Sequence, residues 1–72
     1  MTMRFTTTFQ REGNWFVAHC AELGVTSQGD TLEAAERNLR EAIELYLEDV
    51  PAEERQRFAD HPLIKTIDLE SA

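Results

Sequence analysis

The 72-residue sequence has a single cysteine, two prolines, three glycines and no long apolar run. Cys20 cannot form a disulfide within the chain, which favours a reducing compartment. No stretch approaches the roughly 18 apolar residues that a membrane helix requires. No apolar leader follows a basic N-terminus, so the sequence predicts a cytoplasmic protein without membrane contact.

Basic residues are also scarce, because seven Lys and Arg stand against 14 Asp and Glu, giving a net charge of −7. Proteins bind phosphate backbones mainly through Lys and Arg, so we expect no direct binding of nucleic acid. The charge would steer the chain toward a basic partner. It is equally consistent with a surface charged for solubility.

The length sets a limit on the core. A chain of this size forms one domain, residues 1–72, and buries only about 60% of the surface that its unfolded form exposes. Association would enlarge this small core, so we expect a homodimer or homotetramer.

The first third of the chain alternates between apolar and polar residues, which is typical of strands. The pattern predicts a strand over residues 3–10, a turn at 12–14 ("EGN") and a second strand over 15–20 ("WFVAHC"). The short connection makes these two an antiparallel hairpin. Residues 25–28 ("VTSQ") can form a short third strand.

Both faces of the second strand carry apolar side chains, which places this strand in the centre of the sheet with a helix on one side. The alternation puts Trp15, Val17 and His19 on one face and Phe16, Ala18 and Cys20 on the other.

From Thr31 the apolar period changes to 3.6, which predicts a helix to about Glu48. Asp30 or Thr31 can cap its first turn, and Glu33 can act as the acidic member of a capping box with Asp30. The apolar stripe contains Leu32, Ala35, Leu39, Ala42, Ile43, Tyr46 and Leu47.

The remaining sequence predicts two further elements. Pro51 fits the first turn of a short second helix with Asp49 as its cap, ended by His61-Pro62. Residues 64–69 alternate weakly and predict a last strand. The fold class is then α+β, a three- to four-stranded antiparallel sheet with one main helix on a face, in the order βββα(α)β.

No residue pattern indicates catalysis, a cofactor or a metal. "SQGDT" has one glycine and no lysine, unlike a phosphate-binding loop. His19 and Cys20 are adjacent on a strand and point to opposite faces, so they form neither a metal site nor a nucleophile–base pair. Glu12 and Glu22 lie at the two ends of the second strand, too far apart to act together.

The segment that joins the third strand to the helix resembles the N-terminal domain of the HicB antitoxins and their stand-alone relatives. The resemblance covers about residues 5–48. It rests on "SQGDTLEAA" at residues 27–35, followed by Asn38-Leu39, Glu41-Ala42-Ile43 and Tyr46-Leu47.

This resemblance implies a partially degraded ribonuclease H-like fold without the carboxylates of the nuclease. It also implies binding to a small basic RNA-cleaving toxin, HicA. Many members of the family carry a C-terminal DNA-binding domain. This sequence ends at Ala72 without one, so promoter binding is not expected. Ala21 stands where the family often has proline.

Three functions follow. The first is a non-enzymatic antitoxin-like domain that neutralises a HicA-like toxin. The second is a stand-alone oligomeric protein with a structural or regulatory role and no toxin. The third is a residual nuclease that uses Glu12 or Glu22. For the first two, the hairpin is the expected contact surface, through Trp15, Val17, His19 and Glu22.

Overall fold

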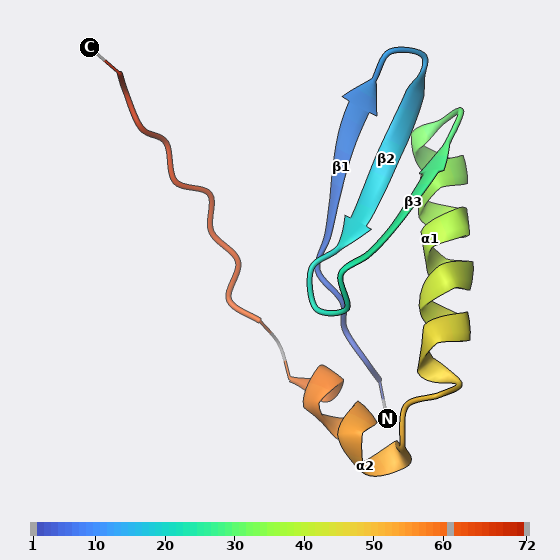
Figure 1. The fold of residues 1–72 in the computed structure, drawn as a ribbon. Coiled ribbons are helices and arrows are strands. Elements are labelled where there is room, and N and C mark those ends of the chain that lie inside the picture. The colour runs from blue at the N-terminus through green and yellow to red at the C-terminus, as the bar shows by residue number, and fades with distance from the viewer. Residues whose placement is uncertain (1, 61, 72) are drawn as a thin grey trace.

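A computed structural model describes residues 2–60 and 62–71 and confirms an α+β fold with one three-stranded antiparallel sheet, one long helix and a short one. The sheet order is β1-β2-β3, so β2 is central as predicted. The elements in chain order (Figure 1) are β1 (Thr7–Glu12), β2 (Trp15–Cys20), β3 (Val25–Gly29), α1 (Leu32–Leu47), α2 (Ala52–Arg55) and the 3₁₀ turn η1 (Gln56–Ala59).

The β1–β2 hairpin forms as the sequence predicts, with Gly13 at φ +59° in its turn. However, β1 begins at Thr7, so the prediction of a strand from residue 3 is wrong at its start. The backbone there has other partners, since the Thr6 amide donates to the Glu22 carboxylate (2.7 Å) and the Arg4 amide to the Phe58 carbonyl (2.6 Å).

One face of the sheet carries the core. Helix α1 packs against β3 and β2, and Ala18 and Cys20 of β2 meet Ala35 and Leu39 of α1, all four of them buried. The predicted stripe is wider than this contact, so Leu32 and Tyr46 at its margins remain exposed whereas Leu47 is buried.

Thr31 is the N-cap of α1, because its side-chain oxygen accepts a hydrogen bond from the Ala34 amide (3.0 Å). The alternative cap at Asp30 is therefore wrong. The capping box is wrong too, since Ala34 occupies the third helical position and Glu33 lies one residue too early. Glu33 still places a negative charge in the first turn, and its favourable interaction with the helix dipole stabilises α1.

The C-terminal end of α1 is closed by a side chain that the sequence pattern did not reveal. The Arg55 guanidinium donates to the carbonyls of Leu47 (2.6 Å) and Val50 (3.0 Å). Pro51 is the N-cap of α2 and lies outside its first turn, and Asp49 lies in the turn after α1. The predictions for Pro51 and Asp49 are therefore wrong by one to two residues.

The short helices are anchored to the N-terminal segment. The buried Phe58 packs against Phe5 with ring centroids 5.0 Å apart, and its carbonyl accepts the hydrogen bond from Arg4. This contact fixes the end of η1 beside the start of β1.

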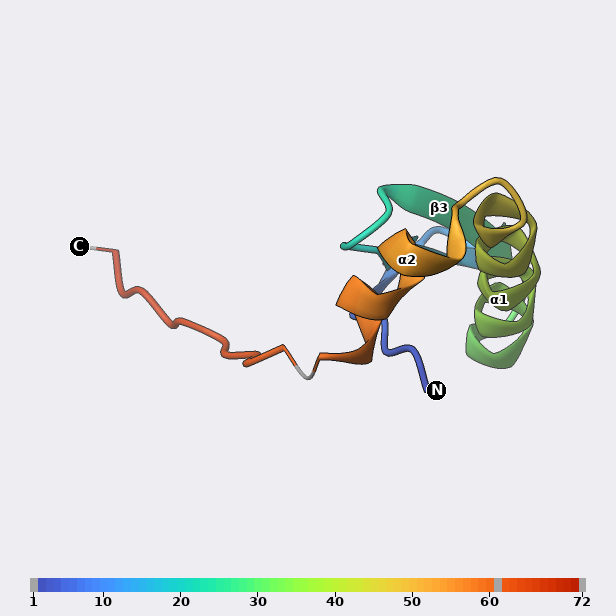
Figure 2. The ribbon, with the colours of Figure 1, turned by 90° about the horizontal axis from the view of Figure 1, so that it is seen from below.

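Residues 62–71 form no strand, so the prediction of a fourth strand over residues 64–69 is wrong for this chain's own sheet. The segment extends away from the body in both views (Figures 1 and 2). An alternating pattern indicates a strand without saying which edge it joins. The expected helix end at His61 lies outside the described residues. Within the described ranges, no helix is long and apolar enough to cross a membrane.

Candidate protein-binding surface

The face of the sheet opposite α1 is left uncovered by the helix and forms what we call the open sheet face. Strand register places on it alternate residues of all three strands, and most of them are exposed. They are Thr8, Gln10, Glu12, Trp15, Val17, His19, Thr26 and Gln28.

Trp15 is the largest side chain of the open sheet face and is 47% exposed. It lies opposite Glu12 at the turn end of the hairpin. Beside it, the junction of β3 and α1 forms a mostly polar hollow of about 350 Å³ lined by Gln28 and Arg37, among others. A large aromatic side chain left half exposed beside a polar hollow is suited to contact with another molecule.

His19 and Val17 complete the row along β2. The imidazole Nδ1 of His19 lies 2.9 Å from the Thr26 hydroxyl of β3, a cross-strand hydrogen bond that holds the ring on the open sheet face. Val17 lies between Gln10 and Gln28 on the neighbouring strands. The three predicted contact residues of β2 are therefore aligned on one surface.

Glu22, the fourth predicted contact residue, lies apart from this row, in the turn between β2 and β3. Its carboxylate accepts hydrogen bonds from the Thr6 amide and the Thr6 hydroxyl, both at 2.7 Å. Partial burial acts to raise the pKa of Glu22, but these hydrogen bonds outweigh it and leave the pKa below its ordinary value. Glu22 therefore ties the N-terminal segment to the sheet.

Cys20 lies on the helix-covered face, fully buried, whereas the adjacent His19 is exposed. The prediction that these two side chains point to opposite faces is confirmed. Burial raises the pKa of the Cys20 thiol, and the neighbouring Glu22 carboxylate raises it further. A protonated thiol is a poor nucleophile, so Cys20 serves as a small core residue.

Glu12 and Glu22 lie at opposite ends of the β1–β2 hairpin. Glu12 ends β1 opposite Trp15, and Glu22 follows the far end of β2, so the hairpin separates the two carboxylates that a residual nuclease would use. In residues 2–60 and 62–71, no group of three or more His, Cys, Asp or Glu side chains is placed to hold a metal ion.

Comparisons with protein-family models, with curated proteins and with solved structures gave no match to this chain. The likeness to HicB antitoxins and to the ribonuclease H fold therefore stays a prediction from sequence.

The sequence prediction missed the contributions of β1 and β3 to this surface, from Gln10, Thr26 and Gln28. Hairpin register would have supplied Gln10, because a two-residue turn at 13–14 fixes which residues lie opposite Val17 and His19. The placement of Thr26 and Gln28 on this face depends on the register between β2 and β3. The sequence does not determine that register, because the turn at 21–24 is longer than the hairpin turn at 13–14.

Proposed function

We propose that this chain is a non-enzymatic binding domain of the HicB antitoxin type, which masks a small basic RNA-cleaving protein in the cytoplasm. The observation that carries the proposal is the alignment of Trp15, Val17 and His19 on an uncovered sheet face. The resemblance of residues 27–47 to the antitoxin motif gives the class of partner.

Two physical features support a basic protein partner. The net charge of −7 favours encounter with a cationic surface and disfavours a phosphate backbone. A half-exposed tryptophan surrounded by polar side chains resembles the centre of a binding surface, where a few large residues contribute most of the affinity. Glu12 and Gln10 supply acceptors for lysine or arginine at its margin.

Inhibition of RNA cleavage tests the proposal. The tagged chain is used to capture proteins from a lysate of its own source organism, and each captured protein is purified and assayed on RNA. We expect one small basic protein that cleaves RNA alone and loses this activity when an equimolar amount of the chain is added. Capture of no RNA-cleaving protein, or cleavage that the chain leaves unchanged, would contradict the proposal.

A second candidate is a stand-alone oligomeric protein with a structural or regulatory role. It is favoured by the exposed apolar side chains of residues 62–71, which suit self-association. Self-assembly of the purified chain together with no captured RNA-cleaving protein would select this candidate over the first.

A further inference from the structure

The C-terminal segment, residues 62–71, exposes its apolar side chains to an unusual extent. Leu63, Ile64, Ile67 and Leu69 are between 68% and 101% exposed. The radius of gyration is 14.3 Å, whereas a compact chain of this length has about 11 Å. Large apolar side chains exposed together on a projecting segment mark it as an interaction site.

The free edge of β1 is a surface with which residues 62–71 can pair. β1 is an outer strand, and the Ala21 amide donates to the Thr6 carbonyl (2.9 Å). Antiparallel pairing alternates inward and outward groups, so the amides and carbonyls of Thr7, Phe9 and Arg11 point away from β2. An outer strand with unpaired groups accepts a further strand from another chain.

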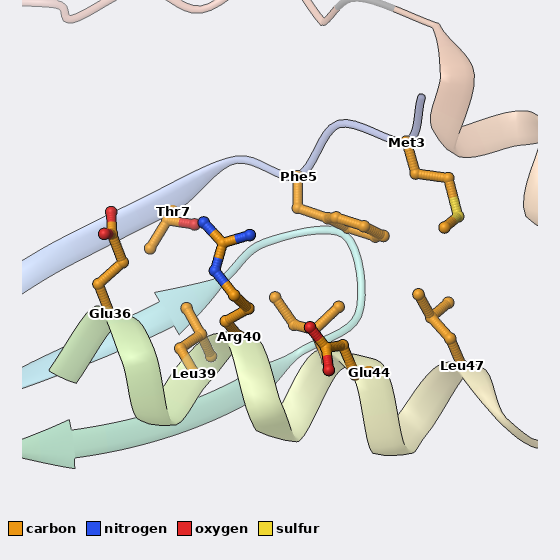
Figure 3. Close-up of a pocket in the computed structure, with 9 residues that line it drawn as sticks. Met3, Phe5, Thr7, Glu36, Leu39, Arg40, Glu44 and Leu47 are labelled. Atoms are coloured by element: carbon orange, nitrogen blue, oxygen red, sulfur yellow. The ribbon is translucent and has the colours of Figure 1, made fainter. Parts of the chain in front are cut away.

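A groove of about 390 Å³, lined by apolar and charged side chains, lies beside this edge, between the N-terminal segment and α1 (Figure 3). We call it the β1 groove. It exists because α1 packs on β2 and β3 and leaves the same side of β1 uncovered, where Phe9 is 36% exposed. Its apolar lining is Met3, Phe5, Leu39, Ile43 and Leu47, and Thr7 lines it as well.

On the side that would face the groove, the only charge of the segment is Lys65, because Asp68 and Glu70 lie on its other face. In an extended strand Leu63, Lys65, Ile67 and Leu69 share one face. Glu36 and Glu44 also line the β1 groove, on either side of Arg40. A strand laid on the β1 edge would place Leu63 and Ile67 over apolar surface and Lys65 within reach of these carboxylates.

We infer that residues 62–71 add as a fourth strand to the β1 edge of a second copy of this chain, and that the second copy returns the same contact. The segment leaves its own body in both views (Figures 1 and 2), which directs it to another molecule. Ten extended residues span about 33 Å, longer than the six-residue β1. Two equal contacts close a symmetric dimer.

This inference does not depend on the proposed function, since it uses the β1 edge rather than the open sheet face and needs no partner protein. Its failure would leave the antitoxin proposal unchanged.

The test compares the wild-type chain with Ile67→Asp and Thr66→Asp by light scattering at micromolar concentration. Ile67 lies on the groove-facing side of the strand, and Thr66, one residue earlier, lies on the other side, so the two substitutions place the same negative charge on opposite faces. We expect twice the 8.3 kDa chain mass for the wild type and for Thr66→Asp. For Ile67→Asp we expect the single-chain mass, through a dissociation constant raised at least about tenfold. A monomeric wild type, or a dimeric Ile67→Asp, would overturn the inference.

Amide hydrogen exchange distinguishes pairing of residues 62–71 with β1 of a second copy from pairing with β1 of the same chain. We expect residues 62–71 to be protected at high protein concentration and to lose protection on dilution. Protection that is independent of concentration would mean that the segment pairs with its own β1, and no protection at any concentration would mean that it pairs with neither. Either result overturns the inference. Both substituted residues are exposed, and the unfolding midpoint checks that each variant folds.

Discussion

Gly29 marks the closest approach of the sheet to the helix. A Cβ atom at this position would lie 2.5 Å from the Ala35 nitrogen and 2.7 Å from the Ala34 carbonyl carbon. These are backbone atoms, so they cannot turn aside as a flexible side chain would. The φ of Gly29 is not positive, so the backbone conformation does not require glycine at this position. The close contact with the backbone of α1 does.

Gly29→Ala should reduce the free energy of unfolding by about 1–3 kcal/mol, because the added methyl group pushes α1 away from β3. Urea denaturation of the purified protein measures this. Gly13→Asn is the matched control. It adds a larger side chain in open space at a φ that Asn tolerates, and it should change stability by less than about 0.5 kcal/mol. Equal stability of Gly29→Ala and the wild type would show that this contact is not tight.

Glu22 links stability to pH through its hydrogen bonds from Thr6. Its pKa in the folded protein is lowered from an ordinary value of 4.5, so its contribution is fully present above that value. The contribution is lost as the pH falls through the lower folded pKa. Exposure to solvent keeps it small.

Glu22→Gln should therefore lower the unfolding temperature slightly at pH 7 and have less effect as the pH falls below 4.5. Thermal unfolding of both proteins from pH 7 to pH 3 measures the difference. A difference that stays constant, or grows toward low pH, would contradict the assigned role of the carboxylate.

Among the secondary-structure elements, α1 depends on Arg55 for the closure of its last turn. Arg55→Met keeps the apolar stem but leaves the Leu47 and Val50 carbonyls without their guanidinium donor. We expect a loss of about 0.5–1.5 kcal/mol for each hydrogen bond removed. The loss should be accompanied by faster amide exchange at the C-terminal end of α1. Arg37→Met, on an exposed part of α1, should change neither quantity; similar effects of the two substitutions would argue against a capping role.

The strands and α1 follow from local patterns, and this is why the sequence predicts them well. Period-two alternation and the Gly13 turn produce the hairpin, and the 3.6-residue period from Leu32 produces the helix. At the start of α1 the local pattern offers two adjacent caps, Asp30 and Thr31, and the capping box that it predicts with Glu33 fits only Asp30, whereas Thr31 is the cap. The roles of Gly29 and Arg55 depend instead on which backbone groups come together in the fold, and local patterns do not contain that information.

The predicted fourth strand over residues 64–69 also fails because a local pattern does not contain long-range information. Its alternation is present in the sequence, but the pairing edge is decided by tertiary or intermolecular contacts. For the candidate surface, the sequence correctly aligned Trp15, Val17 and His19. It did not separate Glu22 from them, because the Thr6 amide and hydroxyl that engage this carboxylate lie 16 residues away.

Considered as a whole, the sheet offers two distinct surfaces. The open sheet face is centred on β2 and carries Trp15 and His19. The second surface consists of the outer edge of β1 and the groove between the N-terminal segment and α1. Self-association through the edge would leave the open sheet face accessible, so a dimer could present two copies of it to its partners. The excess of acidic side chains would speed association with the proposed basic partner most at low ionic strength.

We propose above that this domain binds a basic protein through the open sheet face. The most direct measurement is the dissociation constant of the captured RNA-cleaving protein for the wild type, Trp15→Ala and Tyr46→Ala. Trp15 and Tyr46 are equally exposed, at 47% and 48%, but Tyr46 lies on α1. We expect Trp15→Ala to weaken binding about 30-fold or more, as loss of a central aromatic contact does, and Tyr46→Ala to leave it unchanged. Unchanged binding by Trp15→Ala, or an equal loss for both variants, would contradict the claim.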